Sequence, residues 1–267
     1  MSRVVVLTGA SEGIGAEMAR QLAAGGDKLV LAARNLEALT AVVRACEAKG
    51  AEALAVRTDV SVEADCRALI VAAVARFGGV DVLINNAGVS AHALFEEVSE
   101  LRWCEDLMRV NLWGAVWCTH AALPYLRASQ GRIVAVSSLA GLVGVPGRTA
   151  YSASKFAMTG FFEALRAELR PHGVCVTTAF PGVVATQIRY NGFNARGERA
   201  GVSGLKEEGA MTAETCARLI LTGMERRQRE VVMTAKGRIG RYLKLLAPGL
   251  VEKMALAALK DDVQPRS

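Results

Sequence analysis

Aromatic residues are scarce in this chain of 267 residues. Phe, Trp and Tyr make up 5% of the sequence, whereas hydrophobic residues of all kinds make up 52%. The apolar content therefore comes mainly from small and branched aliphatic side chains, accompanied by 26 glycines. This composition favours helices packed closely on a sheet over a β-sandwich. The length would allow two small domains, but α/β domains of this size are often single.

Clustered metal ligands and paired cysteines are also missing. The six cysteines lie far apart without a Cys-x-x-Cys pair, and the three histidines are equally dispersed. In a chain of this length, such a pattern indicates neither a disulfide framework nor a zinc site. We expect reduced thiols, no bound metal and a cytoplasmic location.

Long apolar runs are absent too. The chain has no run of about 18 apolar residues, so we expect no membrane-spanning helix. Strand-like residues begin at Arg3, which predicts that no signal peptide precedes the fold.

Acidic residues are too few to balance the basic ones near the C-terminus. The net charge is +6, and residues 225–267 hold ten Lys or Arg against five Asp or Glu, a net of +5. Apolar residues recur there at helical spacing, which predicts a basic amphipathic helical extension over 238–260. Closing a pocket or contacting a subunit is favoured for it over resting on a membrane surface. No nucleic-acid motif accompanies the charge, so we expect no nucleic-acid partner.

A glycine-rich turn follows the first strand-like segment. The strand at 3–8 leads into Gly9, Gly13 and Gly15, and then into a helical pattern at 16–24. Strand, glycine turn and helix form the arrangement that binds the pyrophosphate of a dinucleotide, because the backbone can approach closely and the helix presents free N–H groups. Glycines also make ordinary turns between strands and helices, so this motif needs support from the rest of the chain.

Strand and helix patterns alternate along most of the sequence. Strands are predicted at 28–33, 52–58, 80–84, 132–137, 174–180 and 230–233, and helices at 36–49, 61–77, 99–126, 150–169 and 212–226. Ser61 and Thr212 are the predicted N-caps of two of these helices. The alternation predicts an α/β fold, a Rossmann-like doubly wound parallel sheet of about seven strands with helices on both faces. No linker or repeat interrupts it, so residues 1–267 are expected to form a single domain.

A tyrosine and a lysine stand four residues apart at the start of a helix-like segment. Tyr151 and Lys155 would share one helix face, and Ser138 follows a predicted buried strand. The three side chains can therefore converge on one polar pocket. A cation about 4 to 6 Å from a phenol lowers its pKa, which suits general acid-base catalysis. An ordinary surface pair has the same Tyr-Lys spacing.

Five motifs in order resemble those of the short-chain dehydrogenase/reductase family. They are the turn from Thr8 to Gly15, the segment Asn85-Asn86-Ala87-Gly88, Ser138, the pair Tyr151 and Lys155, and Pro181-Gly182. The resemblance implies an enzyme in which Ser138 polarises a carbonyl and Tyr151 exchanges a proton. Lys155 would lower the tyrosine pKa and hold the nicotinamide ribose. Spacing selects Ser138 over its neighbour Ser137.

Asn111 lies among apolar residues in the middle of a predicted helix. The resemblance implies that it holds a water molecule that contacts the catalytic lysine and extends a proton relay. An amide satisfied by backbone groups in a helix kink is a second interpretation, compatible with the first.

The resemblance also implies a nicotinamide dinucleotide cofactor. The residues implied in its binding are Gly9, Ser11, Gly13, Ile14, Gly15, Arg34, Asp59, Val60, Asn86, Ala87, Gly88, Tyr151, Lys155, Pro181, Gly182 and Thr186.

The end of the second predicted strand bears on which dinucleotide is bound. NAD-binding proteins place an acidic side chain there to hold the ribose 2′-hydroxyl, but here Ala33 is followed by Arg34. A guanidinium suits a 2′-phosphate, so the sequence favours NADP(H) over NAD(H). The family's other NADP feature, a basic residue just before the second glycine, is replaced by Glu12, and the preference rests mainly on Arg34.

These residues imply an NADP(H)-dependent oxidoreductase that transfers a hydride between the nicotinamide and a carbonyl or secondary alcohol. The stretch 151–162 resembles family members that act on steroids and other bulky carbonyls, which implies a hydrophobic ketone or steroid-like substrate and carbonyl reduction in a reducing cytoplasm. A 3-oxoacyl thioester reductase is the alternative among enzymes. A non-catalytic NADP(H)-sensing regulator is the alternative of another class.

Two segments predict features beyond the chemistry. Residues 187–211 lack periodicity and are interpreted as a substrate lid with Tyr190 and Phe193 as apolar contacts, a plain surface loop being the alternative. Small residues along the helix at 150–169 would let a neighbouring helix approach closely, so a homodimer or homotetramer is expected. These small residues are Ala153, Ala157, Gly160 and Ala164.

Overall fold

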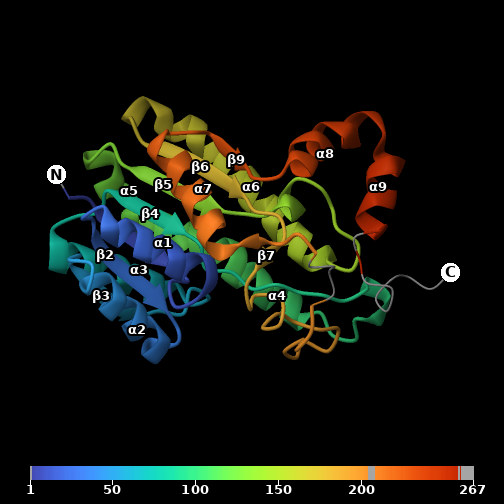
Figure 1. The fold of residues 1–267 in the computed structure, drawn as a ribbon, viewed down its shortest axis with the longest axis horizontal. Coiled ribbons are helices and arrows are strands. Elements are labelled where there is room, and N and C mark those ends of the chain that lie inside the picture. The colour runs from blue at the N-terminus through green and yellow to red at the C-terminus, as the bar shows by residue number, and fades with distance from the viewer. Residues whose placement is uncertain (1, 204–207, 258, 260–267) are drawn as a thin grey trace.

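Seven parallel strands form the central sheet in the computed structural model of the protein, which describes residues 2–203, 208–257 and 259 (Figure 1). Their order is β3-β2-β1-β4-β5-β6-β9. The strands are β1 (Val4–Thr8), β2 (Lys28–Ala33), β3 (Ala53–Arg57), β4 (Val82–Asn85), β5 (Arg132–Val136), β6 (Cys175–Phe180) and β9 (Glu230–Val232). A separate short pair consists of β7 (Val184–Ala185) and β8 (Met211–Thr212).

Helices cover both faces of the sheet (Figure 1). One face carries α1 (Gly13–Ala24), α2 (Leu36–Glu47) and α7 (Ala213–Glu225), and the other carries α3 (Glu63–Phe77), α5 (Gly114–Ala128) and α6 (Thr149–Leu169). The predicted doubly wound fold is therefore confirmed, and so is the number of strands in its sheet.

The strands are buried on both faces, and for this reason the sequence shows them as continuous apolar runs. Along β1, Val5 and Leu7 belong to one hydrophobic cluster and Val6 to the other. The first cluster packs under α1, α2 and α7, and the second under α3, α5 and α6. This alternation places two apolar layers on either side of one sheet.

The predicted helix over 99–126 is divided in the structure. α4 (Arg102–Met108) ends in a π-helical turn at Arg109–Trp113, and α5 begins directly after it. A π turn accommodates one extra residue in a helix and is frequent at functional sites. The predicted helical pattern is confirmed from residue 102 onward, and the structure adds the π turn, which an apolar pattern does not reveal.

One of the two predicted N-caps is confirmed. Thr212 accepts a hydrogen bond from the backbone N–H of Thr215 at 3.1 Å and caps α7. Ser61 does not cap α3, because its hydroxyl donates to Asp59 Oδ1 at 2.7 Å and the N-cap position falls to Val62. An acceptor two residues earlier thus outcompetes the helix N-terminus for this serine.

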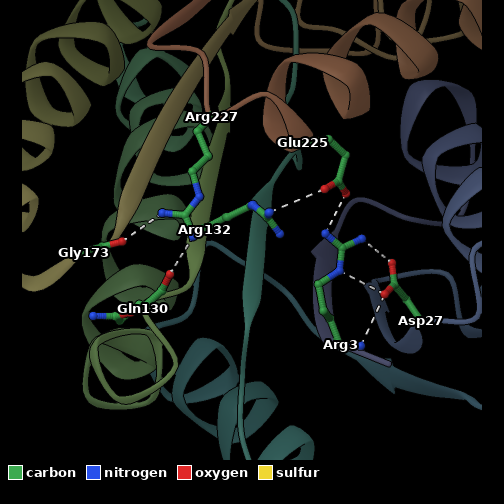
Figure 2. A network of polar contacts seen from close by, with 7 residues as sticks. All are labelled: Arg3, Asp27, Gln130, Arg132, Gly173, Glu225 and Arg227. Carbon is green, nitrogen blue, oxygen red and sulfur yellow. Dashed lines mark hydrogen bonds and ion pairs between the residues drawn. The ribbon is translucent and has the colours of Figure 1, made fainter. Parts of the chain in front are cut away.

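A polar network lies at the edge where the strands begin (Figure 2). Arg3 donates to Asp27 Oδ1 at 3.0 Å from Nε and to Oδ2 at 2.7 Å from Nη2. Glu225, the last residue of α7, lies 2.6 Å from Arg3 Nη1 and 3.5 Å from Arg132 Nη2. The network ties α7 to the starts of β1 and β5.

A second arginine extends this attachment (Figure 2). Arg227 donates to the carbonyl oxygens of Gly173 and Gln130, both at 3.2 Å. The turn after α7 is thus fixed beside the connections that lead into β5 and β6. All of these contacts lie at the opposite edge from the carboxyl ends of the strands.

Two helices project from the last strand, α8 (Ala235–Leu246) and α9 (Pro248–Ala257) (Figure 1). They overlap the predicted extension at 238–260, although α8 begins three residues earlier, and residues 258 and 260 lie outside the described residues. Lys244 of α8 donates to the carbonyl oxygen of Leu142, and its Nζ lies 5.0 Å from the centre of the Phe156 ring. Within the described ranges, no helix is long and apolar enough to cross a membrane.

The remaining short helices join these elements. They are the 3₁₀ turns at Phe95–Glu97, Leu139–Gly141 and Arg170–His172. The segment predicted as a lid is irregular at 187–203 and 208–210, its last residue Met211 begins β8, and residues 204–207 lie outside the described part.

Candidate active site

A cleft of about 730 Å³ opens at the carboxyl ends of the strands, where the strand order reverses between β1 and β4. Doubly wound sheets bind ligands at this position. The cleft is lined by the first glycine turn, the ends of β2 and β4, the start of α6 and the segment after β6. Every predicted catalytic or cofactor residue lines it except Asn111, which lies behind its wall.

The glycine turn has no room for a side chain at Gly9 or Gly15. Gly9 and Gly13 have φ angles of +66° and +55°, which favour glycine. A Cβ on Gly15 would lie 2.0 Å from the Gly9 carbonyl oxygen, and one on Gly9 would lie 2.8 Å from the Cα of Ala87. α1 begins here, and Glu12 at its N-cap provides no side-chain hydrogen bond. The uncapped N–H groups fit the pyrophosphate of a dinucleotide.

The amide of Asn86 connects the two strands that border the cleft. Its Nδ2 donates to the carbonyl oxygens of Thr8 and Gly9, at 3.0 and 3.1 Å. In return, Thr8 Oγ1 accepts from the backbone N–H groups of Asn86 and Ala87, both at 3.1 Å. These bonds hold the ends of β1 and β4 together beneath the glycine turn.

The end of β2 forms the outer part of the cleft. Ala33 is buried, and the exposed side chain of Arg34 follows it at the cleft border. Asp59 and Val60 line the same region. The Asp59 carboxylate accepts from the backbone N–H of Ser61 at 2.9 Å, which fixes the turn after β3.

Tyr151 and Lys155 are both buried on the first turns of α6, at 6% and 3% exposure. Lys155 Nζ donates to the carbonyl oxygen of Val136 at 3.0 Å and lies 5.8 Å from the centre of the Tyr151 ring. Ser138, two residues after the end of β5, lines the cleft together with Tyr151 and Lys155. Phenol, ammonium and hydroxyl therefore meet at one wall of the cleft.

Ser137 has a different environment. Its hydroxyl donates to the backbone carbonyl oxygen of Lys155 at 3.2 Å and lies 3.2 Å from Thr159 Oγ1. It thus ties β5 to α6 beneath the cleft, and the hydroxyl that reaches Tyr151 is that of Ser138.

Electrostatics lower the pKa of Tyr151 below its ordinary value. Burial raises this pKa, but the charges of Lys155 and Arg148, the hydrogen bond from Ser138 and the charge of Arg189 outweigh it. Burial also lowers the pKa of Lys155, against the attraction of Tyr151. The lowered pKa makes the Tyr151 phenol easier to deprotonate, as a residue that exchanges protons during catalysis requires.

Asn111 is fully buried in the π turn and faces the segment after β4. Its Oδ1 accepts from the Val89 N–H at 2.8 Å, and its Nδ2 donates to the Val89 carbonyl oxygen at 2.9 Å and to Ser154 Oγ at 3.0 Å. Most hydrogen-bond partners of the amide are thus backbone groups of Val89, which agrees with the second interpretation given for Asn111 in the sequence analysis. The amide fixes Val89, which lines the cleft.

Two buried arginines at this cleft were missed in the sequence. Arg148 lies three residues before Tyr151, its guanidinium carbon 4.3 Å from the ring centre. Arg189 donates to Ser203 Oγ at 3.0 Å and to the Val184 carbonyl oxygen at 3.1 Å. Arg148 is the N-cap residue of α6 and has non-helical backbone angles, so helical spacing gives no signal for it. Arg189 gives no signal in the sequence either.

The predicted lid contributes one of its two aromatic candidates to the cleft. Phe193 lines it, and its ring centre lies 5.8 Å from that of Trp103. Among the described residues, Tyr190 does not belong to the lining.

Comparison with known proteins identifies the family. The family model described as short chain dehydrogenase matches residues 3–196. The chain belongs to the short-chain dehydrogenase family. Members of this family are oxidoreductases that bind NAD or NADP and act on alcohol or carbonyl groups, and this short-chain dehydrogenase is accordingly an oxidoreductase.

Among its relatives is the 11-beta-hydroxysteroid dehydrogenase A of Sesamum indicum, 37% identical over 256 residues, which are 94% of this chain and 73% of the relative. Two solved structures are similar. A short-chain dehydrogenase/reductase from Burkholderia phymatum in complex with NAD has a TM-score of 0.81 and 28% identity, covering 100% of this chain and 98% of its own. An alcohol dehydrogenase from Thermococcus sibiricus complexed with 5-hydroxy-NADP has a TM-score of 0.77 and 26% identity, covering 87% and 96%.

Proposed function

We propose that this short-chain dehydrogenase is an NADP(H)-dependent oxidoreductase that interconverts a carbonyl and a secondary alcohol by a Ser-Tyr-Lys mechanism. The observation that carries the proposal is the convergence of Ser138, Tyr151 and Lys155 on one wall of the cleft, with the Lys155 ammonium 5.8 Å from the Tyr151 ring. A bound nicotinamide dinucleotide supplies or accepts the hydride.

The residues of the chain have separate tasks in this proposal. Ser138 donates its hydroxyl hydrogen to the substrate carbonyl oxygen and polarises the bond. Tyr151 gives its proton to the same oxygen during reduction and takes it back during oxidation. Lys155 stays close to the ring because Val136 holds its ammonium at 3.0 Å, and its charge stabilises the phenolate. Asn111 keeps Val89 in place and supports a relay of protons to solvent through water near Lys155.

NADP(H) is the proposed cofactor. The cleft fits a dinucleotide because its glycine turn and uncapped helix N-terminus match a pyrophosphate. Arg34 lies at the cleft border after β2, where a ribose phosphate would be recognised. The solved relatives carry either NAD or an NADP derivative, so Arg34 is the feature of this chain that supports the choice.

The proposed substrate is a hydrophobic ketone or a steroid-like carbonyl compound. The name of the sesame relative, an 11-beta-hydroxysteroid dehydrogenase, supports this class. Apolar side chains of Val89, Ile188 and Phe193 line the cleft. We propose that residues 187–211 act as its lid. A screen of steroid ketones, simple ketones and 3-oxoacyl thioesters, followed by NADPH oxidation, tests the class, and turnover of thioesters alone would refute it.

We also propose a homodimer or homotetramer in a reducing compartment, the cytoplasm. Of the four small residues of α6 that were expected at an interface, Ala153, Gly160 and Ala164 are exposed and Ala157 is partly buried, and light scattering would measure the assembly. All six cysteines are free thiols, which suits a reducing compartment. The projecting α8 and α9 are assigned to pocket closure or subunit contact in preference to a membrane surface.

Replacing Tyr151 tests the mechanism. Tyr151→Phe removes the exchangeable proton and keeps the ring, so we expect kcat/KM to fall by about a hundredfold to ten-thousandfold with unchanged NADPH binding. Fluorescence titration of NADPH is the control for an intact cleft. Turnover close to that of the wild type in this variant would remove Tyr151 from the proton transfer.

A further inference from the structure

Arg148 is a buried cation beside the catalytic tyrosine. It precedes α6, lines the cleft and is 9% exposed. Burying a guanidinium is costly unless its charge and its N–H groups find partners. The contacts of Arg148 therefore indicate what the residue does.

The hydrogen bonds of Arg148 go to neutral groups. Its Nε donates to the Ala91 carbonyl oxygen at 3.2 Å, and its Nη2 donates to the hydroxyl of Ser90. The guanidinium carbon then lies 4.3 Å from the centre of the Tyr151 ring, within the range of a cation–π contact. The nearest group that can become an anion beside this cation is the phenol.

The acceptors of Arg148 belong to a fixed segment. Ser90 and Ala91 are both buried, at 2% exposure. They follow Val89, whose backbone N–H and carbonyl oxygen are both bonded to the side chain of Asn111, at 2.8 and 2.9 Å. The guanidinium is thus held between the segment after β4 and the tyrosine ring.

Arg148 is one of several groups that act on Tyr151. Lys155 lies on the same helix, Arg189 follows β7, and Ser138 follows β5. The Arg148 guanidinium carbon lies 4.3 Å from the ring centre, compared with 5.8 Å for the Lys155 ammonium. Burial lowers the pKa of Arg148, and the attraction of Tyr151 opposes this effect.

We propose that Arg148 is a positioning residue, whose guanidinium holds the Tyr151 ring in place and stabilises its phenolate form together with Lys155. This inference rests on the proposed function, because it assigns Tyr151 the proton transfer. The inference adds Arg148 to the mechanism as a second cation. The segment at 89–91 then holds the Arg148 guanidinium in place.

Ultraviolet titration of phenolate tests the proposal without a substrate. The chain has 4 tyrosines, and the difference between the wild-type protein and Tyr151→Phe isolates the titration of Tyr151. In Arg148→Gln, we expect the midpoint of this step to move up by about one pH unit, because a nearby opposite charge is lost. Arg148→Lys keeps the charge, so its midpoint should lie between the two. An unmoved midpoint in Arg148→Gln would overturn the inference.

Activity measurements separate the two levels of the argument. With the ketone from the substrate screen, Arg148→Gln should lower kcat by about tenfold or more at unchanged NADPH affinity. Wild-type turnover in Tyr151→Phe would refute the proposed function itself. Loss of turnover in Tyr151→Phe, combined with wild-type kcat and titration in Arg148→Gln, would refute the role of Arg148 alone.

Ser90→Ala provides a test if Arg148→Gln fails to fold. It removes the acceptor of Nη2 and leaves the charge and the helix intact. We expect kcat to fall about threefold to tenfold with NADPH binding unchanged, since the guanidinium loses one of its two anchors. A kcat equal to that of the wild type in both Ser90→Ala and Arg148→Lys would overturn the positioning role.

Discussion

The charge around Tyr151 determines how activity should depend on pH. Reduction needs the protonated phenol and oxidation needs the phenolate, so the two directions have opposite pH dependences. The pKa of Tyr151 is lowered from its ordinary value of 10.0. The midpoints of the pH–rate curves for reduction and for oxidation should therefore both lie below pH 10. We expect kcat/KM to rise with pH for alcohol oxidation and to fall for ketone reduction.

Lys155→Met is the matched variant for this profile. It removes the cation that lies 5.8 Å from the ring, so the midpoints of both pH–rate curves should move to higher pH. Initial rates over a pH series in both directions provide the measurement. Midpoints at or above pH 10 in the wild-type enzyme would contradict the proposed stabilisation of the phenolate.

Arg34 should set the choice between the two dinucleotides. Arg34→Ala loses a charged hydrogen-bond donor for the 2′-phosphate, so the ratio of kcat/KM for NADPH to that for NADH should fall by at least about tenfold. Arg44→Ala, an exposed position on α2 outside the cleft lining, is the control and should leave the ratio unchanged. An equal ratio in both variants would contradict the proposal that Arg34 recognises the 2′-phosphate.

Most residues of the candidate site could be placed from the sequence, because glycine turns and helical spacing are local patterns. The turn from Gly9 to Gly15 and the pair Tyr151 and Lys155 are examples. Arg148 could not be interpreted in this way. A lone arginine before a helix resembles a solvent-exposed residue, and its partners Ser90 and Ala91 are more than fifty positions away, brought close only by the parallel sheet.

At the scale of elements, α8 supports the loop that carries Ser138. A Cβ on Gly237 would lie 2.3 Å from Leu139 Cδ2 and 3.0 Å from Thr234 Oγ1, the group that caps α8. Gly237→Ala must therefore shift the side chain of Leu139, the residue directly after Ser138. We expect kcat to fall by about tenfold with little change in the KM for NADPH.

Gly240→Ala is the control on the same helix, because a Cβ there meets nothing within 4 Å. It should leave kcat unchanged and raise the free energy of unfolding by up to about 1 kcal/mol. Steady-state kinetics and thermal unfolding of both variants provide the comparison. Equal kcat values would show that α8 does not support the loop.

The strands and most helices followed from apolar periodicity, because a strand buried on both faces leaves an uninterrupted apolar run. Three details did not follow. The two-residue strands β7 and β8 are too short to give a pattern. The hydroxyl of Ser61 binds Asp59 in place of a helix N-terminus, and the π turn at Asn111 depends on a bond to Val89 across the fold.

At the scale of the whole molecule, the network at the amino ends of the strands should contribute stability without affecting catalysis. Asp27, with its side chain 6% exposed, accepts from Nε and Nη2 of Arg3. Asp27→Ala leaves these donors unpaired, so we expect the free energy of unfolding to fall by about 2 kcal/mol.

Glu225→Ala is the comparison, because this side chain is 45% exposed. Solvent weakens its ion pairs with Arg3 and Arg132, and the expected loss is about 0.5 kcal/mol. Urea unfolding of both variants measures the difference, and kcat should match that of the wild type in each. A larger loss for Glu225→Ala than for Asp27→Ala would contradict this ranking.

The π turn at Arg109–Trp113 also lets one stretch of helix serve two separate hydrophobic cores. Before the turn, Trp103 and Leu107 pack into a small cluster with Ala91 and Tyr151. After the turn, residues of α5 such as Cys118 pack into the large cluster under the sheet. The extra residue rotates the second half of the stretch relative to the first by about a quarter of a turn, since each helical residue advances it by about 100°. If one residue were deleted here, the apolar faces before and after the turn would point in the same direction. One of the two clusters would then lose its contacts with this stretch.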